Sequence, residues 1–130
     1  MRNAANIAQW TVRITGLLQL LLGLLIWTGA VDQLISLHIA SGILLVVALW
    51  VLAGLAIGRA PLGQIVVAFV WGLLMPALGL LQEGLLRGGF HWTIQVLHLL
   101  IGLAAIGMGE GLGRAIRSAA APPTAAEAAR

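Results

Sequence analysis

Two of the three histidines stand inside long apolar stretches, where an ionisable side chain is costly and by default marks a functional site. His38 lies within the residues LHIASG, and His98 lies within the residues QVLHLLIG. Each histidine is followed four residues later by a glycine, Gly42 or Gly102, which lies one helical turn further on. Imidazole binds metals and transfers protons near neutral pH. The repeated pattern predicts that the two side chains share one ligand.

Composition indicates that these histidines are surrounded by lipid. Of the 130 residues, 61% are hydrophobic and 8% are charged, whereas a soluble domain carries about 25% charged residues. The formal net charge of +3 comes from arginines at the ends of apolar stretches. We therefore interpret them as signals of membrane topology and expect no nucleic-acid binding. Because the chain has no cysteine, disulfides, iron–sulfur clusters and thiolate metal sites are excluded.

Four apolar stretches are long enough to cross a bilayer, since about 18–20 apolar residues span its hydrocarbon core. The first stretch also resembles a signal peptide, but its length and the flanking Trp10 and Trp27 favour a membrane helix. Pro76 lies inside the third stretch and predicts a kink. Glu83 and Glu110 are expected at solvated helix ends. The stretches cover about residues 14–31, 34–58, 64–82 and 91–108.

Short links between these stretches predict an all-α membrane protein, an up-down bundle of four transmembrane helices. The bundle is expected over residues 14–112, after an N-terminal segment (1–13) and before an Ala/Pro-rich tail (113–130) that is flexible or weakly helical. All arginines except Arg87 fall on one side of this threading. The positive-inside rule then places both termini in the cytoplasm, and we expect a multi-pass protein of the bacterial inner membrane.

The threading places the two apolar histidines at matching depth. The second and fourth helices run in the same direction, and His38 and His98 lie roughly 6–10 Å below the outer boundary at 1.5 Å per residue. In a four-helix bundle taken in order, these helices are diagonal neighbours. A single haem b with one imidazole on each face would use both histidines, and Gly42 and Gly102 would leave room for the macrocycle. Structural histidines, a proton relay or another metal are the alternatives.

Three further residues are candidates for the same site. His91 and Arg87, at the outer boundary, could meet the haem propionates, or His91 could be an ordinary interfacial residue beside Trp92. Gln95 lies three residues before His98 and could orient an imidazole or bind a quinone head group. More often such a glutamine only forms hydrogen bonds between helices.

The helix pattern and both histidine segments, over about residues 10–112, resemble one half of haem A synthase. The resemblance implies haem b ligation by His38 and His98. The sequence departs from that family by having no cysteine pair in an outer loop and no glutamate just before His38, so the resemblance does not extend to the oxidation of a methyl group.

The sequence therefore predicts a membrane cytochrome b that exchanges electrons with a quinone or a redox partner protein at the outer face, alone, as a homo-oligomer or within a larger redox complex. One haem near that face lies too far from the cytoplasm to carry electrons across a core of about 30 Å. Two other classes stay open: a cofactor-free accessory subunit and a small transporter. The transporter is disfavoured because no carboxylate is expected at mid-membrane.

Overall fold

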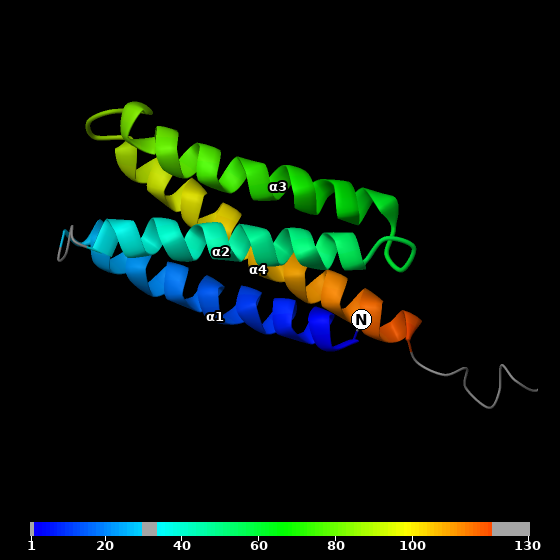
Figure 1. Ribbon diagram of the computed structural model, residues 1–130. Coiled ribbons are helices and arrows are strands. Elements are labelled where there is room, and N and C mark those ends of the chain that lie inside the picture. The colour runs from blue at the N-terminus through cyan, green and yellow to red at the C-terminus, as the bar shows by residue number, and fades with distance from the viewer. Residues whose placement is uncertain (1, 30–33, 121–130) are drawn as a thin grey trace, which may run out of the picture.

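Four long antiparallel helices form the part of the chain that the computed structural model describes, residues 2–29 and 34–120 (Figure 1). Each is long and apolar enough to cross a membrane. The predicted all-α four-helix bundle is confirmed for these residues, and it is consistent with a multi-pass integral membrane protein. The elements are α1 (Arg2–Trp27), α2 (Ile35–Leu55), α3 (Leu62–Leu81), the short 3₁₀ helix η2 (Gln82–Gly84) and α4 (His91–Ala119).

The link between α2 and α3 shows how these helices begin and end. In lipid a helix is favoured because it satisfies its own backbone groups, but its last carbonyls need other donors. At the end of α2, Arg59 Nη1 donates to the Leu55 carbonyl at 2.9 Å, and Gly58 takes a positive φ of 74°. Pro61 precedes α3, where its fixed φ suits a helix start. From there α3 continues as one helix through Pro76.

The helices pack in chain order around a ring, so that α1 contacts α2 and α4, and α3 contacts the same two helices. In addition, α2 and α4 touch across the diagonal. Helix α4 runs obliquely behind α2, starting beside α3 and ending beside α1 (Figure 1). Leu45, Leu49 and Leu52 of α2 and Leu112 of α4 are almost fully buried at the centre. Because α4 is oblique, its first half packs mainly beside α3 at one end of the bundle and its second half beside α1 at the other.

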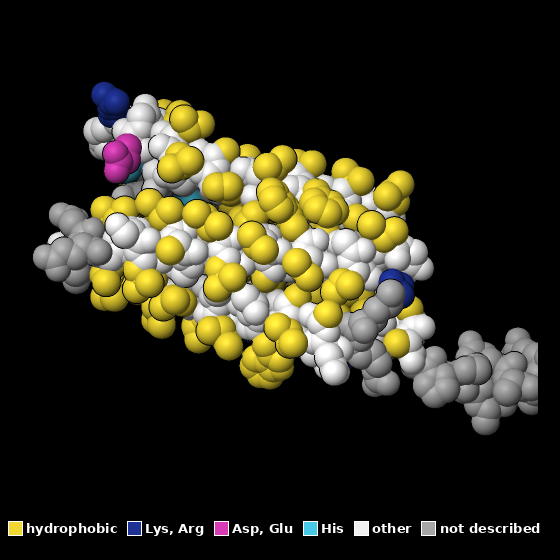
Figure 2. All heavy atoms as spheres, in the orientation of Figure 1, with side chains coloured by type: hydrophobic (Ala, Val, Ile, Leu, Met, Phe, Trp, Pro, Cys, Tyr) yellow, Lys and Arg dark blue, Asp and Glu magenta, His cyan; other side chains and the backbone are white. Residues whose placement is uncertain are grey.

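We name the two ends by their side chains. The histidine end contains the starts of α2 and α4 with His38 and His98, and the arginine end contains Arg59, Arg114 and Arg117 (left and right, respectively, in Figure 1). Between the ends, the surface in Figure 2 is largely covered by apolar side chains. Many large hydrophobic residues on every helix are exposed, which is the pattern of a surface that faces lipid.

Two helices extend beyond the apolar stretches. Helix α1 begins at Arg2 and therefore includes nearly all of residues 1–13, and α4 continues through residues 113–119. These extensions pack against each other. The side chain of Val12 lies against the backbone of Gly109, and the side chain of Gln9 lies against the backbone of Gly113. Packing between helices therefore orders segments that their own polarity did not mark as helical. The short link at residues 32–33 and the tail residues 121–130 lie outside the described residues.

Candidate functional site

The structure brings the two apolar histidines together. His38 lies in the first turn of α2, and His98 lies two turns into α4. Their imidazole centroids are 6.2 Å apart, and the ring planes are tilted by 51°. Both side chains are half-buried. Two histidines separated by 60 positions in the sequence thus face each other across the diagonal contact of α2 and α4.

The separation of the rings fits two ligands on opposite sides of one metal ion. Such imidazoles have centroids roughly 6 Å apart, because each metal–nitrogen bond is about 2 Å long and each nitrogen lies about 1 Å from its ring centre. The observed 6.2 Å agrees with this value. A pair of imidazoles supplies only two ligands, and the equatorial ligands of a haem iron come from the porphyrin itself.

One nitrogen of each ring also lacks a protein partner. Within the described residues, the Nδ1 atoms of His38 and His98 are buried and form no hydrogen bond. Leaving a buried polar atom unsatisfied costs about 1–3 kcal/mol, and each such atom in a native structure needs an explanation. A ligand that binds directly to these nitrogens is one such explanation.

Two glycines keep side chains away from the nitrogen-bearing edges of the rings. A Cβ atom on Gly23 of α1 would lie 3.4 Å from His38 Cε1, and one on Gly79 of α3 would lie 3.3 Å from His98 Cε1. Cε1 is the ring carbon between the two nitrogens, so a larger residue would press on that edge. The ring separation, the buried nitrogens and these two glycines are compatible with a haem held between the two imidazoles.

Sequence reasoning missed these two glycines. A signal does exist: glycines recur seven residues apart at positions 16 and 23 of α1 and again at positions 72 and 79 of α3. Seven residues are two helical turns, so each pair lies on one helix face. This spacing is a weak signal, because the glycines stand on the helices that carry no histidine and 17 glycines are spread over the chain.

The two glycines that follow the histidines have different surroundings. A Cβ atom on Gly42 would lie 3.1 Å from Nε2 of Gln19, so the space at Gly42 holds the carboxamide of α1. At Gly102 nothing that the structure describes lies within 4 Å of such an atom. Contact of either glycine with a macrocycle stays a prediction. Gly42 also leaves room for the side chain of Gln19.

The remaining predicted site residues lie at the histidine end without touching the pair. The Nδ1 atom of His91 donates to the Leu85 carbonyl at 3.1 Å, which ties the start of α4 to the preceding loop. Arg87 is exposed in that loop, beside Leu86, whose φ of 44° is strained for a leucine. Gln95 is half-buried and forms no side-chain hydrogen bond within the described part of the chain. Their predicted roles stay predictions.

The expectation for Glu110 was wrong. It lies inside α4, and its carboxylate accepts hydrogen bonds from Arg13 Nε at 2.5 Å, Arg13 Nη2 at 2.9 Å and Gln9 Nε2 at 2.8 Å. Arg117 also donates to the Gln9 carbonyl oxygen. The physical reason is that α1 extends alongside α4, which provides partners that the sequence did not reveal. Glu83, in η2, is exposed as expected.

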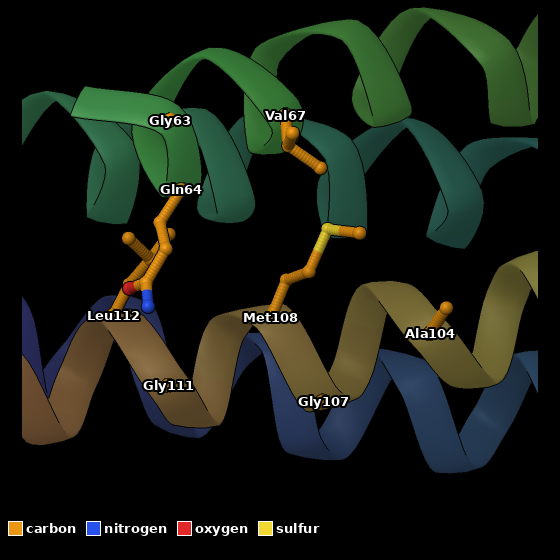
Figure 3. Close-up of a pocket in the computed structure, with 8 residues that line it drawn as sticks. All are labelled: Gly63, Gln64, Val67, Ala104, Gly107, Met108, Gly111 and Leu112. Atoms are coloured by element: carbon orange, nitrogen blue, oxygen red, sulfur yellow. The ribbon is translucent and has the colours of Figure 1, made fainter. Parts of the chain in front are cut away.

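A separate hollow of about 480 Å³ lies far along α4, between the start of α3 and the second half of α4. Figure 3 shows Gln64 and Val67 pointing from α3 towards Leu112 and Met108 of α4. Gly107 and Gly111 form part of its floor, and both face open space. The hollow is at the arginine end, so it is not part of the histidine pair.

The chain matches no protein-family model, no curated protein and no solved structure. Among the described residues, no group of three or more His, Cys, Asp or Glu side chains could hold a metal ion. The arrangement available for chemistry is therefore the two-histidine pair, its flanking glycines and the contacts of Gln19.

Proposed function

We propose that the protein is a membrane cytochrome b in which His38 and His98 are the axial ligands of a single haem b. The observation that supports this most is the pair of facing imidazoles, 6.2 Å apart, each with a buried nitrogen that lacks a partner among the described residues. When bound, the haem would supply reversible one-electron chemistry at its iron.

The residues of the chain would hold, orient and shield this group. The two histidines come from helices that touch each other, so their separation is fixed by the packing of α2 against α4. Gly23 and Gly79, which carry no Cβ atom, leave room for the nitrogen-bearing edges of the two rings. His91 and Arg87, at the same end, are candidates to bind the haem carboxylates, and Gln95 is a candidate to orient His98.

Orientation is part of the proposal. Arg59, Arg114 and Arg117 stand at one end and Arg87 at the other, so the positive-inside rule places the arginine end and both termini in the cytoplasm. The histidine end then faces outward from a bacterial inner membrane. Electron exchange would occur there, with a quinone or a redox partner protein, and the protein could work within a larger redox complex or as a homo-oligomer.

The test compares wild type with three variants that each lack one histidine, in detergent after haem is supplied. Wild type is expected to give a low-spin, six-coordinate spectrum that changes on reduction. His38→Ala and His98→Ala should each lose haem or become high-spin, because each would remove one axial ligand. His91→Ala is the control for iron ligation. It removes an imidazole from the same end, and even a lost contact with a haem carboxylate removes no axial ligand, so the haem that binds should stay low-spin.

A wild-type chain that folds but takes up no haem would contradict the proposal and favour a cofactor-free accessory subunit. Proton movement driven by a transported substrate, again without haem, would favour a transporter. Equal loss of the low-spin spectrum in all three variants would show that the histidine end as a whole matters and that the pair does not supply the ligands.

A further inference from the structure

Gln19 on α1 reaches the turn of α2 that carries His38. Its side-chain nitrogen Nε2 lies 2.5 Å from the backbone carbonyl oxygen of His38 and 2.8 Å from Ser41 Oγ, and it donates to both. A backbone carbonyl has two lone pairs, so this carbonyl can accept from Gln19 as well as from its own helix. The backbone of a candidate ligand is thereby tied to a neighbouring helix.

Ser41 completes the connection. It is buried, and its hydroxyl donates to the Leu37 carbonyl at 2.7 Å. A hydroxyl has one proton to donate, so Ser41 can accept from Gln19 while it donates to Leu37. The carboxamide of α1 therefore holds both the carbonyl of His38 and the residue one position before His38, through Ser41.

Gly42 makes this arrangement possible. A Cβ atom at Gly42 would approach Gln19 Nε2 to 3.1 Å and its Cδ to 3.5 Å. On α1, Gly23 lies one turn after Gln19 and faces the His38 ring. Helix α1 therefore contacts His38 at two levels, with a carboxamide at its backbone and a bare glycine at its imidazole.

The other histidine has no equivalent tie. The residue one turn before Gly79 on α3 is Met75, which is buried and has no donor to offer. Near His98, the carbonyl bound by a side chain is that of Ile101, which accepts from Trp71 Nε1 at 2.9 Å. Among the described residues, the backbone of His38 is fixed from outside its own helix and the backbone of His98 is not.

We propose that Gln19 is a positioning residue that fixes His38 as a haem ligand. This inference rests on the proposed function. It predicts that loss of the carboxamide contact loosens His38 while leaving His98 unaffected. Outer-shell partners of metal ligands typically change metal affinity by about 10–100-fold, so the expected effect on haem retention is about tenfold.

The main test uses Gln19→Met, which keeps the length of the side chain, removes its donor and copies the residue found at the equivalent position of α3. Gly42→Ala is an independent variant that should push the same carboxamide away. Gln64→Met is the matched control, because it removes a carboxamide at the arginine end of α3, away from both histidines. Haem dissociation, the midpoint potential and the electron paramagnetic resonance spectrum of the oxidised protein report on the axial ligands.

Faster haem loss by about tenfold in Gln19→Met and Gly42→Ala, with a changed resonance spectrum and little change in Gln64→Met, would support the proposal. Haem loss and spectra equal to wild type in both variants would overturn it while leaving the proposed function intact. A wild-type chain without haem would instead overturn the proposed function, and the positioning role of Gln19 in haem binding with it.

Backbone amide exchange in the cofactor-free protein provides a readout that does not depend on haem. Residues 38–45 should exchange faster in Gln19→Met than in wild type, because the turn has lost its tie to α1. Unchanged exchange over these residues would show that Gln19 does not fix this turn, and it would overturn the proposal even if the variant bound haem less well.

Discussion

The arginine end and the histidine end of this bundle treat their polar side chains in opposite ways. At the arginine end, Gln9, Arg13, Glu110 and Arg117 bond to one another across α1 and α4. At the histidine end, two buried imidazole nitrogens have no partner among the described residues. Polar groups that satisfy one another in a membrane hold helices together. Buried groups without partners are the ones that a bound ligand could satisfy. The arginine end is therefore expected to stabilise the bundle, and the histidine end is the candidate binding site.

The glycines of α4 show the same contrast. At Gly109 and Gly113 a Cβ atom would lie 2.8 Å from Val12 and 2.5 Å from Gln9, so α1 packs directly on the backbone. At Gly107 and Gly111 a Cβ atom would meet nothing described within 4 Å. One helix thus offers two glycine pairs with the same spacing, one used for packing and the other open, and these pairs provide matched controls.

The largest expected effect breaks the arginine end. Gly113→Ala should displace the Gln9 carboxamide from Glu110 and Arg117, and lower the free energy of unfolding by about 1–3 kcal/mol through overpacking and unsatisfied polar groups. Gly111→Ala should instead be neutral or raise it by about 0.5–1 kcal/mol, because alanine is the better helix former. Denaturant unfolding of the cofactor-free protein in detergent would measure both, and equal effects would contradict the proposed packing.

The next effect breaks the histidine end without weakening the fold. Gly79→Ala would place a Cβ atom 3.3 Å from His98 Cε1, so the ring must move. We expect haem retention to fall about tenfold while the cofactor-free protein unfolds within about 0.5 kcal/mol of wild type. Gly23→Ala, with its looser 3.4 Å approach, should have a smaller effect. Gly54→Ala, which adds a methyl group in open space on α2, is the control.

A third variant sharpens the difference between apo stability and haem binding. Gly102→Ala adds a methyl group where nothing described lies within 4 Å. The cofactor-free protein should therefore be stabilised by about 0.5–1 kcal/mol. If a haem lies over this position, as the sequence pattern predicts, haem loss should become faster in the same variant. Unchanged haem loss would remove Gly102 from the site.

The last expected effect concerns the contact between α3 and α4 that lies between the two ends. Trp71→Phe removes the donor to the Ile101 carbonyl and should lower the free energy of unfolding by about 1 kcal/mol. Trp92→Phe, at an exposed ring, should change it by less than about 0.5 kcal/mol. Thermal unfolding of the two variants side by side would test this, and a larger loss in Trp92→Phe would contradict the assignment.

The sequence was sufficient to predict the four helices and the meeting of the two histidines. Both follow from a strong constraint, since helices in lipid must satisfy their own backbone and parallel helices place equal depths side by side. Helix lengths were predicted less well, because α1 and α4 continue past the apolar stretches where they pack on each other. That packing also explains why Glu110 was wrongly expected to be solvated.

Contacts between side chains on different helices were beyond sequence reasoning. The contact of Gln19 with His38 depends on which face of α1 meets α2, and α1 is apolar over most of its surface near this contact. For the same reason the sequence favours Gln95, which is close to His98 along the chain, as the residue that orients an imidazole, and it does not single out Gln19. Separation along one helix identifies neighbours on that helix only, and here the neighbour that matters comes from another helix.

The matched glycine spacing in α1 and α3 makes the two hairpins of the bundle resemble each other. Gly16 of α1 receives Ile106 from α4, and Gly72 of α3 receives Trp50 from α2, while Gly23 and Gly79 each face the histidine of the following helix. The two hairpins α1–α2 and α3–α4 thus share one arrangement, in which a glycine of the first helix faces the histidine of the second. They differ at one position: Gln19 of α1 binds the backbone of its hairpin's histidine, whereas Met75 of α3 has no donor with which to do so.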